Sequence, residues 1–159
     1  EWIDYYNREK RYRGPKLIHV DPPLDHIPVY LKKNSIYVTG NIFDGNRKVW
    51  TPDSSKQHFL DIYATPSSGD GSAEFIYVDP AGGNSERVIR MEREKSTIRV
   101  TADTIGTVGE IHIALEQEPA SIVSGGVTGD KITFDKKAKE LIVPLPGGEA
   151  VEITVSLKQ

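Results

Sequence analysis

The chain has 159 residues with 37% apolar side chains, which is enough for one well-formed hydrophobic core or two small ones. Its 20 basic and 23 acidic residues nearly cancel to a net charge of −3, which excludes the strong field typical of proteins that bind nucleic acid or anionic membranes. The absence of cysteine excludes a disulfide framework, a thiolate nucleophile and a sulfur-ligated zinc site.

The first forty residues contain short runs that are typical of strands. Residues 2–6 alternate in polarity, and residues 16–20 form an apolar run that ends at a double proline. Residues 27–31 and 35–38 predict a hairpin, because Asn34 between them tolerates the left-handed backbone of a tight reversal.

A sheet of about four strands is too small to bury both of its faces. Residues 1–42 are therefore predicted to be the remnant of a larger sheet whose apolar side packs on another domain. Residues 43–56 show no sustained periodicity and combine turn residues with polar ones, so they are predicted to be a linker between domains.

Residues 57–159 predict a second domain that is an antiparallel β-sandwich. Short strands recur every eight to twelve residues, and glycine-rich or charged turns separate nearly every pair. The strands are predicted at residues 59–64, 73–79, 86–92, 97–102, 110–116, 121–123, 131–134, 141–145 and 151–157. The charged stretch 86–95 also suits a helix, and the strand is favoured. The fold class is therefore all-β, with a small partial antiparallel sheet followed by an antiparallel sandwich.

Three stretches carry a family resemblance in the order in which the family has them. Residues 1–6 with 11–14 give a Trp-Ile-Asp-Tyr strand and a Tyr-Arg-Gly turn, and residues 23–29 read Pro-Leu-Asp-His-Ile-Pro-Val. The strand pair 61–64 and 75–79 follows. Together they resemble the β-domains that follow the catalytic barrel in glycoside hydrolase family 31, the α-glucosidases and α-xylosidases. Lys32 and Asn34 depart from the arginine and glycine that are usual there.

The resemblance implies that the chain is the non-catalytic C-terminal β-region of a retaining α-glycosidase. The whole enzyme would hydrolyse terminal α-linked glucose or xylose by double displacement, without a metal or an organic cofactor. Its catalytic aspartates belong to a barrel, and nothing in this sequence resembles that barrel, so the chain is expected to be inactive alone. It starts without methionine in the middle of a strand, which is typical of a cut fragment.

Nothing else in the sequence predicts a catalytic, cofactor or metal site. Asp25 is the best-placed acid of the first half, and it is interpreted as a turn cap or a domain contact. The four histidines are not spaced as metal ligands, and His112 is predicted to be exposed because it alternates with buried isoleucines. The acidic glycine turns lack the five or more oxygens of a calcium loop.

The residues expected to contact another domain are apolar, aromatic or turn-forming and lie in the first forty positions. They are Trp2, Tyr5, Tyr6, Leu24, Asp25, Ile27 and Pro28. The expected partners are the catalytic barrel and the N-terminal domain of the parent enzyme, with neither nucleic acid nor membrane among them. An uncovered N-terminal sheet would also favour self-association. The lack of a signal peptide, an apolar span and cysteine favours a cytoplasmic location.

Two alternatives belong to other classes of protein. A free-standing carbohydrate-binding module would present coplanar aromatic rings on an exposed sheet face, with Trp2, Tyr5, Tyr6 and Trp50 as candidates. An immunoglobulin-like interaction domain would need neither a barrel nor a sugar, and its N-terminal half would be stable by itself.

Overall fold

The structure is a computed structural model that describes residues 1–40, 59–79, 83–127 and 129–158. These residues form an all-β fold, as predicted, with one short 3₁₀ turn, η1 (Gly129–Lys131), and no α-helix. No helix among them could cross a membrane. The strands are β1 (Trp2–Asp4), β2 (Arg11–Tyr12), β3 (Tyr30–Lys32), β4 (Ser35–Gly40), β5 (Phe59–Thr65), β6 (Gly71–Asp79), β7 (Ser85–Glu94), β8 (Thr97–Ala102), β9 (Val108–Ala114), β10 (Pro119–Gly125), β11 (Thr133–Asp135), β12 (Glu140–Leu145) and β13 (Val151–Leu157).

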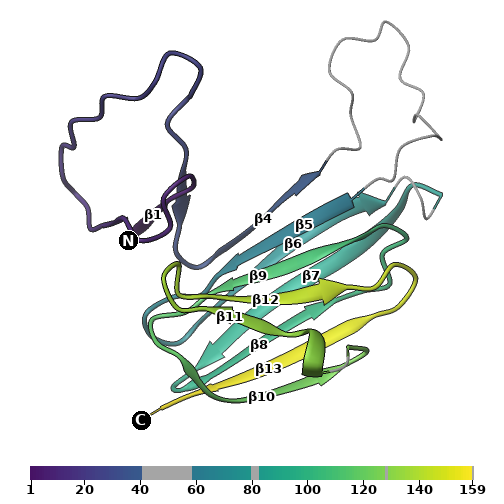
Figure 1. The fold of residues 1–159 in the computed structure, drawn as a ribbon. Coiled ribbons are helices and arrows are strands. Elements are labelled where there is room, and N and C mark those ends of the chain that lie inside the picture. Colours follow the sequence, from purple (N-terminus) through teal and green to yellow (C-terminus); the bar gives the residue numbers. More distant parts are fainter. Residues whose placement is uncertain (41–58, 80–82, 128, 159) are drawn as a thin grey trace, which may run out of the picture.

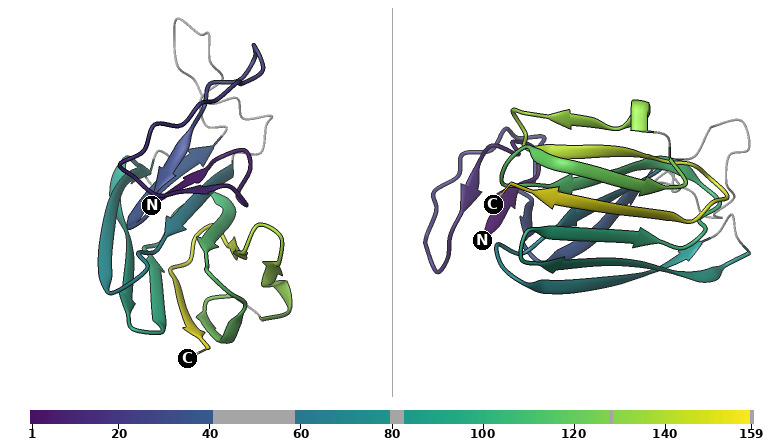
Figure 2. Two further views of the ribbon diagram at one scale, coloured as in Figure 1. Left: turned by 90° about the vertical axis from the view of Figure 1, so that its left-hand side faces the viewer. Right: turned by 90° about the horizontal axis from the view of Figure 1, so that it is seen from below.

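The described strands form three sheets. A small N-terminal sheet has the order β2-β1-β3. Sheet I has the order β11-β12-β9-β5-β4, and sheet II has the order β10-β13-β8-β7-β6. Sheets I and II lie face to face as a sandwich, and the N-terminal sheet with its loops projects from one end of it (Figures 1 and 2).

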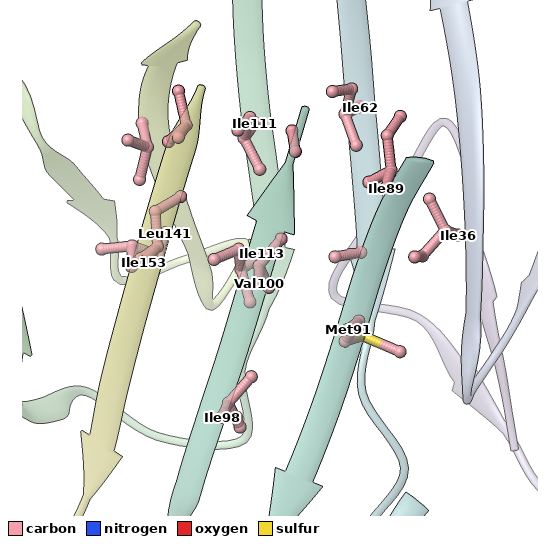
Figure 3. Close-up of a cluster of buried hydrophobic side chains, with 14 of the residues drawn as sticks. Ile36, Ile62, Ile89, Met91, Ile98, Val100, Ile111, Ile113, Leu141 and Ile153 are labelled. Atoms are coloured by element: carbon pink, nitrogen blue, oxygen red, sulfur yellow. The ribbon is translucent and has the colours of Figure 1, made fainter. Parts of the chain in front are cut away.

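The sandwich core follows from strict alternation along the strands. In β13 the residues Val151, Ile153, Val155 and Leu157 are buried. In sheet I the inward positions of β5 and β9 are also aliphatic, and Figure 3 shows their isoleucines facing those of sheet II. Each fully buried side chain of this kind contributes about 1.5 to 3 kcal/mol before conformational entropy is subtracted. The core is therefore that of a self-contained domain.

Sheet I contains one pairing that the sequence did not predict. Strands β5 and β9 run parallel, with Ile62 opposite Ile111 and Tyr63 opposite His112. The chain between them leaves sheet I and builds β6, β7 and β8 in sheet II before it returns. The expectation of a wholly antiparallel sandwich is wrong at this pair, because turn spacing alone cannot show which sheet a strand joins.

The predicted hairpin of residues 27–31 and 35–38 is also wrong. Strand β3 pairs with β1 in the N-terminal sheet, whereas β4 pairs with β5 in sheet I, with Ile36 opposite Ala64. Asn34 does adopt the left-handed backbone, with φ of 60°. Its amide N–H donates to the Thr65 carbonyl, and its side chain donates to the Ser72 carbonyl. Asn34 is therefore the point where the chain passes from one sheet to another.

Other details differ from the predictions in the same region and near the C-terminus. Residues 16–20 are not a strand, and only Ile18 among them is half-buried. The strand predicted at residues 131–134 is divided between η1 and β11. The stretch 86–95 is a strand through Glu94, as favoured. The proposed linker 43–56 lies outside the described residues, and β4 of the preceding segment 1–42 belongs to the sandwich.

Candidate interdomain surface

The N-terminal sheet is built around strand β1. Ile3 and Leu31, which face each other across β1 and β3, are almost fully buried. The Asp4 carboxylate accepts hydrogen bonds from the amides of Tyr6 (2.9 Å) and Asn7 (3.0 Å), which ends the strand in a tight turn. The sheet thus has a small core of its own, and its other residues face either the sandwich or solvent.

Most of the residues predicted to contact another domain are exposed. Trp2 and Tyr6 are about half exposed, Leu24 is fully exposed, and Ile27 is 78% exposed. The side chain of Asp25 is also exposed and lies 2.9 Å from Nδ1 of His26. Pro28 is exposed as well. Large apolar side chains in water at this density are typical of a surface that another protein segment covers.

Tyr5 differs from the other predicted contact residues. It is half-buried and packs edge-on against Tyr37 and Tyr63 on the outer face of sheet I, with ring centroids 6.2 and 6.0 Å away. Tyr5 therefore joins the N-terminal segment to the sandwich of this same chain. The alternation of residues 2–6 showed that Tyr5 and Tyr6 point in opposite directions, but it could not show which side the sandwich occupies.

The structure adds residues to this surface that the sequence analysis missed. Leu17 is 97% exposed, and Val20 and Val29 are also exposed. A hollow of about 470 Å³ lies beside them, lined by Trp2, Tyr12, Arg13, Gly14, Pro15, Lys16, Ile18 and Tyr30. The signal was present in the sequence, because an apolar run that does not pair into a sheet exposes both of its sides. We call the exposed apolar side chains of residues 2–29 the N-terminal apolar surface.

Arg8 anchors the N-terminal segment to sheet I. Its Nε donates to the Tyr5 carbonyl at 2.9 Å, one Nη donates to the Tyr37 hydroxyl at 3.2 Å, and the other lies 3.4 Å from the buried Glu140 carboxylate. The guanidinium carbon lies 4.6 Å from the centroid of the Tyr63 ring, within the range of a cation–π interaction. One side chain thus satisfies partners from the segment and from three strands of sheet I.

Three stacked rings lie under Arg8 on the outer face of sheet I. The rings of Tyr37 and Tyr63 stack at 4.7 Å, and those of Tyr63 and His112 stack at 4.5 Å. Burial raises the pKa of Tyr63 to about 12, and burial also raises the pKa of Tyr37. Both tyrosines therefore stay neutral at physiological pH. His112 was predicted to be exposed, and this is wrong, because the Tyr63 ring stacks on it and Glu140 lies against its Nδ1 atom, which leaves the side chain 11% exposed.

A second ionic cluster joins the segment to Arg93 of sheet II at the same end of the sandwich. The buried Lys33 ammonium lies 2.8 Å from the Glu116 carboxylate and 3.4 Å from that of Glu1, and Arg93 lies 3.6 Å from Glu116. Desolvation raises the pKa of the Glu116 carboxyl, but the hydrogen bond and charge of Lys33, aided by Ser68 and Arg93, outweigh it and hold this pKa below its usual range.

The structure also brings together three groups that could hold a metal ion. Asp61, Glu110 and His112 offer ligand atoms that all lie within 4.8 Å of one another. The two carboxylates are close enough to be compared with the pair in a retaining glycosidase, which are about 5 to 5.5 Å apart. However, the Glu110 amide donates to Asp61 at 3.2 Å, so the two side chains lie side by side on neighbouring strands. They do not face each other across a space for a sugar.

The remaining histidines and tryptophans considered as metal ligands or sugar-binding residues form no cluster among the described residues. His19 and His26 are exposed in the segment, while His58 and Trp50 lie outside the described residues. Trp2 lines the hollow near Tyr12 and Tyr30, whose rings meet edge to face at 5.5 Å. These two rings are therefore not the coplanar platform expected of a carbohydrate-binding module.

The structure is similar to parts of larger solved enzymes. A GH31 dextranase from Flavobacterium johnsoniae gives a TM-score of 0.71 at 19% identity, and the match covers 98% of this chain and 23% of that one. The cycloalternan-forming enzyme from Listeria monocytogenes gives 0.71 at 20% identity, covering 98% and 16%. An alpha-1,4-glucan lyase from Gracilariopsis lemaneiformis gives 0.60 at 15% identity, covering 98% and 19%. No family model matches the sequence, and no curated protein matches it.

The chain spans less than a quarter of the length of each of these enzymes, and almost all of it is used in each match. The sandwich and the N-terminal sheet therefore occur together in the larger structures. The chain has the fold of part of a glycoside hydrolase of family 31, which confirms the resemblance drawn from its strand motifs.

Proposed function

We propose that this chain is the non-catalytic C-terminal β-region of a retaining α-glycosidase and that it supports a catalytic barrel outside this sequence. The observation that carries the proposal is the N-terminal apolar surface, on which Leu17, Leu24 and Ile27 are mostly or fully exposed. Water contact at three large aliphatic side chains costs several kcal/mol relative to burial, at about 25 cal/mol per Å². A covering domain would recover this free energy.

The match to a small part of much larger enzymes supports the same proposal. The dextranase was solved with glucose, and the cycloalternan-forming enzyme with a pentasaccharide substrate. An α-glucan is therefore the substrate class that we propose for the whole protein. Whether the parent enzyme is an α-glucosidase or an α-xylosidase depends on barrel loops, which this chain does not contain.

The first experiment tests whether the chain is non-catalytic. The purified chain is incubated with 4-nitrophenyl α-glucoside, 4-nitrophenyl α-xyloside and dextran, and released nitrophenol and reducing sugar are measured. We expect no hydrolysis above a buffer control. Turnover that is removed by Asp61→Asn or Glu110→Gln would overturn the proposal, because those substitutions target the close carboxylate pair of the described residues.

The second experiment tests the supporting role. The polypeptide encoded upstream in the same reading frame is produced separately and mixed with this chain, and the complex is measured by size-exclusion chromatography with light scattering. We expect a complex that the double variant Leu24→Asp/Ile27→Asp abolishes. Val123→Asp is the matched control, because Val123 is also mostly exposed, at 67%, but lies on β10 of the sandwich.

A carbohydrate-binding module remains the alternative that the hollow beside Trp2 favours. Calorimetric titration of the chain with isomaltotriose separates the two functions. The supporting role predicts no binding heat. Heat that disappears in Trp2→Ala would instead show that the hollow is a sugar site.

A further inference from the structure

Strands β5 and β9 place Asp61, Glu110 and His112 on one face of sheet I. Asp61 lies directly opposite Glu110 in the parallel register, and Glu110 and His112 are two positions apart on β9. Side chains at i and i+2 of a strand project from the same face about 6.6 Å apart, and neighbouring strands are about 4.8 Å apart. This placement brings one imidazole and two carboxylates to a single spot.

Glu140 orients the ring of His112. Nδ1 of His112 lies 3.2 Å from Oε2 of Glu140, and Oε1 of the same buried carboxylate lies 3.4 Å from Arg8. Because a carboxylate held by arginine only accepts hydrogen bonds, Nδ1 carries the proton. Nε2 therefore directs its lone pair away from Glu140, which is the carboxylate–histidine arrangement found behind metal-bound imidazoles.

The Nε2 atom of His112 has no suitable partner among the described residues. It is buried and makes no hydrogen bond, although it lies 3.3 Å from Oε2 of Glu110. An imidazole nitrogen that carries no proton and a carboxylate oxygen are both acceptors, so at this distance either a proton or a metal cation must lie between them. Stacking on Tyr63 prevents the ring from turning away.

The charges of the two carboxylates also favour a cation at this position. Asp61 and Glu110 are like charges directly opposite each other, a pairing that destabilises a sheet. In the described part of the chain, neither carboxylate forms an ion pair with lysine or arginine. Glu110 is half exposed, so ions can reach it from solvent.

We propose that Asp61, Glu110 and His112 bind a first-row divalent cation through one imidazole nitrogen and two carboxylate oxygens. This donor set suits zinc, with solvent as the fourth ligand of a tetrahedron. Zinc ligands lie about 3.4 Å apart, given bonds of about 2.1 Å. The side chains of Asp61 and Glu110 reach that spacing from within 4.8 Å by rotating on the sheet surface. The inference does not depend on the proposed function.

The cation would link β5 to β9, two strands whose ligands are 49 residues apart in sequence. It would replace the repulsion between Asp61 and Glu110 with shared coordination. Zinc that binds the folded chain and not the unfolded chain raises the unfolding temperature, and the stabilisation grows with the logarithm of the free zinc concentration above the dissociation constant. The expected signature is a rise in unfolding temperature on adding zinc, reversed by a chelator.

The test uses the whole chain after treatment with EDTA. Titration with zinc chloride in a calorimeter is expected to show one site per chain. Glu110→Gln and Asp61→Asn are expected to weaken binding by more than about tenfold, because each removes one ligand charge. Glu74→Gln is the matched control, since Glu74 is a half-exposed carboxylate on sheet II. His26→Ala controls for the exposed His26 and Asp25 pair.

Three results would overturn the proposal. One is zinc binding that Glu110→Gln and Asp61→Asn leave unchanged, and another is binding that His26→Ala removes. The third is the absence of zinc binding, and a doubly protonated His112 ring in ¹⁵N NMR spectra at neutral pH would then show that its two N–H groups donate to Glu140 and Glu110. Circular dichroism of each variant shows that the fold is retained, and the half-exposed position of Glu110 makes that outcome expected.

Discussion

Arg8 shows how much one side chain contributes to placing the N-terminal segment. Its guanidinium satisfies the Tyr37 hydroxyl and the buried Glu140 carboxylate, and it covers the Tyr63 ring. In contrast, Arg90 forms a shorter ion pair with Glu74, at 2.7 Å, but both of those side chains are half exposed. Because solvent screens exposed pairs, the shorter distance does not make the second pair stronger.

Replacing Arg8 therefore has a larger effect than replacing Arg90. Arg8→Ala leaves the Glu140 carboxylate buried without its cation and is expected to lower the free energy of unfolding by about 2 to 3 kcal/mol. Arg90→Ala is expected to change it by less than about 0.5 kcal/mol. Urea unfolding followed by tryptophan fluorescence measures both, and equal effects would contradict the assignment of Arg8 as an anchor.

The Glu116 carboxyl gives a pH dependence with a definite sign. The pKa of this carboxyl is lower in the folded chain than in the unfolded chain. The ionised carboxylate therefore contributes its full stabilisation at pH values above the pKa that Glu116 has in the unfolded chain. That stabilisation is lost as the pH falls through the folded pKa. We expect Glu116→Gln to be less stable than the natural chain at pH 7, and the difference to fade below about pH 4.

Lys33 supplies the control for this titration. In a Lys33→Met background the main partner of Glu116 is absent, so Glu116→Gln should change stability little at any pH. Urea midpoints measured at several pH values for the four chains complete a double-mutant cycle. A pH-dependent difference that persists without Lys33 would show that another group sets the pKa of Glu116.

At the level of single residues, the sequence predicted the strand face on which a side chain lies better than it predicted what packs on that face. Alternation correctly placed Trp2 and Ile3 on opposite faces, with Trp2 half exposed and Ile3 buried. The same rule failed for His112, because an outward position on a strand is exposed only if nothing packs on that face. The residues that contact its ring, Tyr63 and Glu140, lie on other strands 49 and 28 positions away, and no local pattern records such a contact.

At the level of elements, the sequence predicted strand positions well because turns and alternation are local. Residues 97–102 and 151–157 were predicted with their observed bounds. Pairing was less predictable, as the division of β3 and β4 between two sheets shows. The partner of a strand depends on which apolar surface packs against it. Two short apolar runs on either side of one turn residue fit a hairpin as well as they fit two strands of different sheets.

The parallel pair β5–β9 depends on a glycine. A side chain at Gly109 would place its Cβ 1.8 Å from the carbonyl oxygen of Leu60, which belongs to the backbone of β5. Gly109→Ala must separate the two strands, and we expect it to lower the free energy of unfolding by about 2 to 3 kcal/mol. Gly125→Ala on edge strand β10 is the control, because its Cβ would meet nothing closer than 4.0 Å.

Thermal and urea unfolding of the two glycine variants measure this difference. The expected order of stability places Gly125→Ala near the natural chain and Gly109→Ala well below it. A neutral Gly109→Ala would mean that β5 and β9 do not approach each other as closely as the structure shows.

At the level of the whole molecule, the sandwich core does not include the N-terminal sheet. Ile36 of β4 belongs to the main buried cluster, whereas Ile3 and Leu31 do not. A chain that starts at Asn34 keeps the complete cluster, and one that starts at residue 57, the predicted domain boundary, loses Ile36 and uncovers the edge of β5. We expect the first to unfold cooperatively and the second to be less stable by more than about 2 kcal/mol.

Urea unfolding of the two shortened chains tests this boundary. Equal stability of the chains 34–159 and 57–159 would show that β4 adds little and would favour the boundary drawn from sequence. We propose that the boundary precedes β4, although the polar stretch after β4 resembles a linker in the sequence. Strand β4 precedes that stretch but pairs with a strand that follows it.

The parallel pair also orders the steps by which the chain reaches its native state. Strands β6, β7 and β8 are joined by consecutive hairpins of sheet II, whereas the pairing of β9 with β5 closes a loop that contains all three. Loop-closure entropy delays such distant contacts. We expect pulse-labelling hydrogen exchange during refolding to protect the amides of β7 and β8 first and those of β9 last. Protection of β9 before β7 would contradict this order, while late protection would identify sheet I as the slow-forming, aggregation-exposed half of the domain.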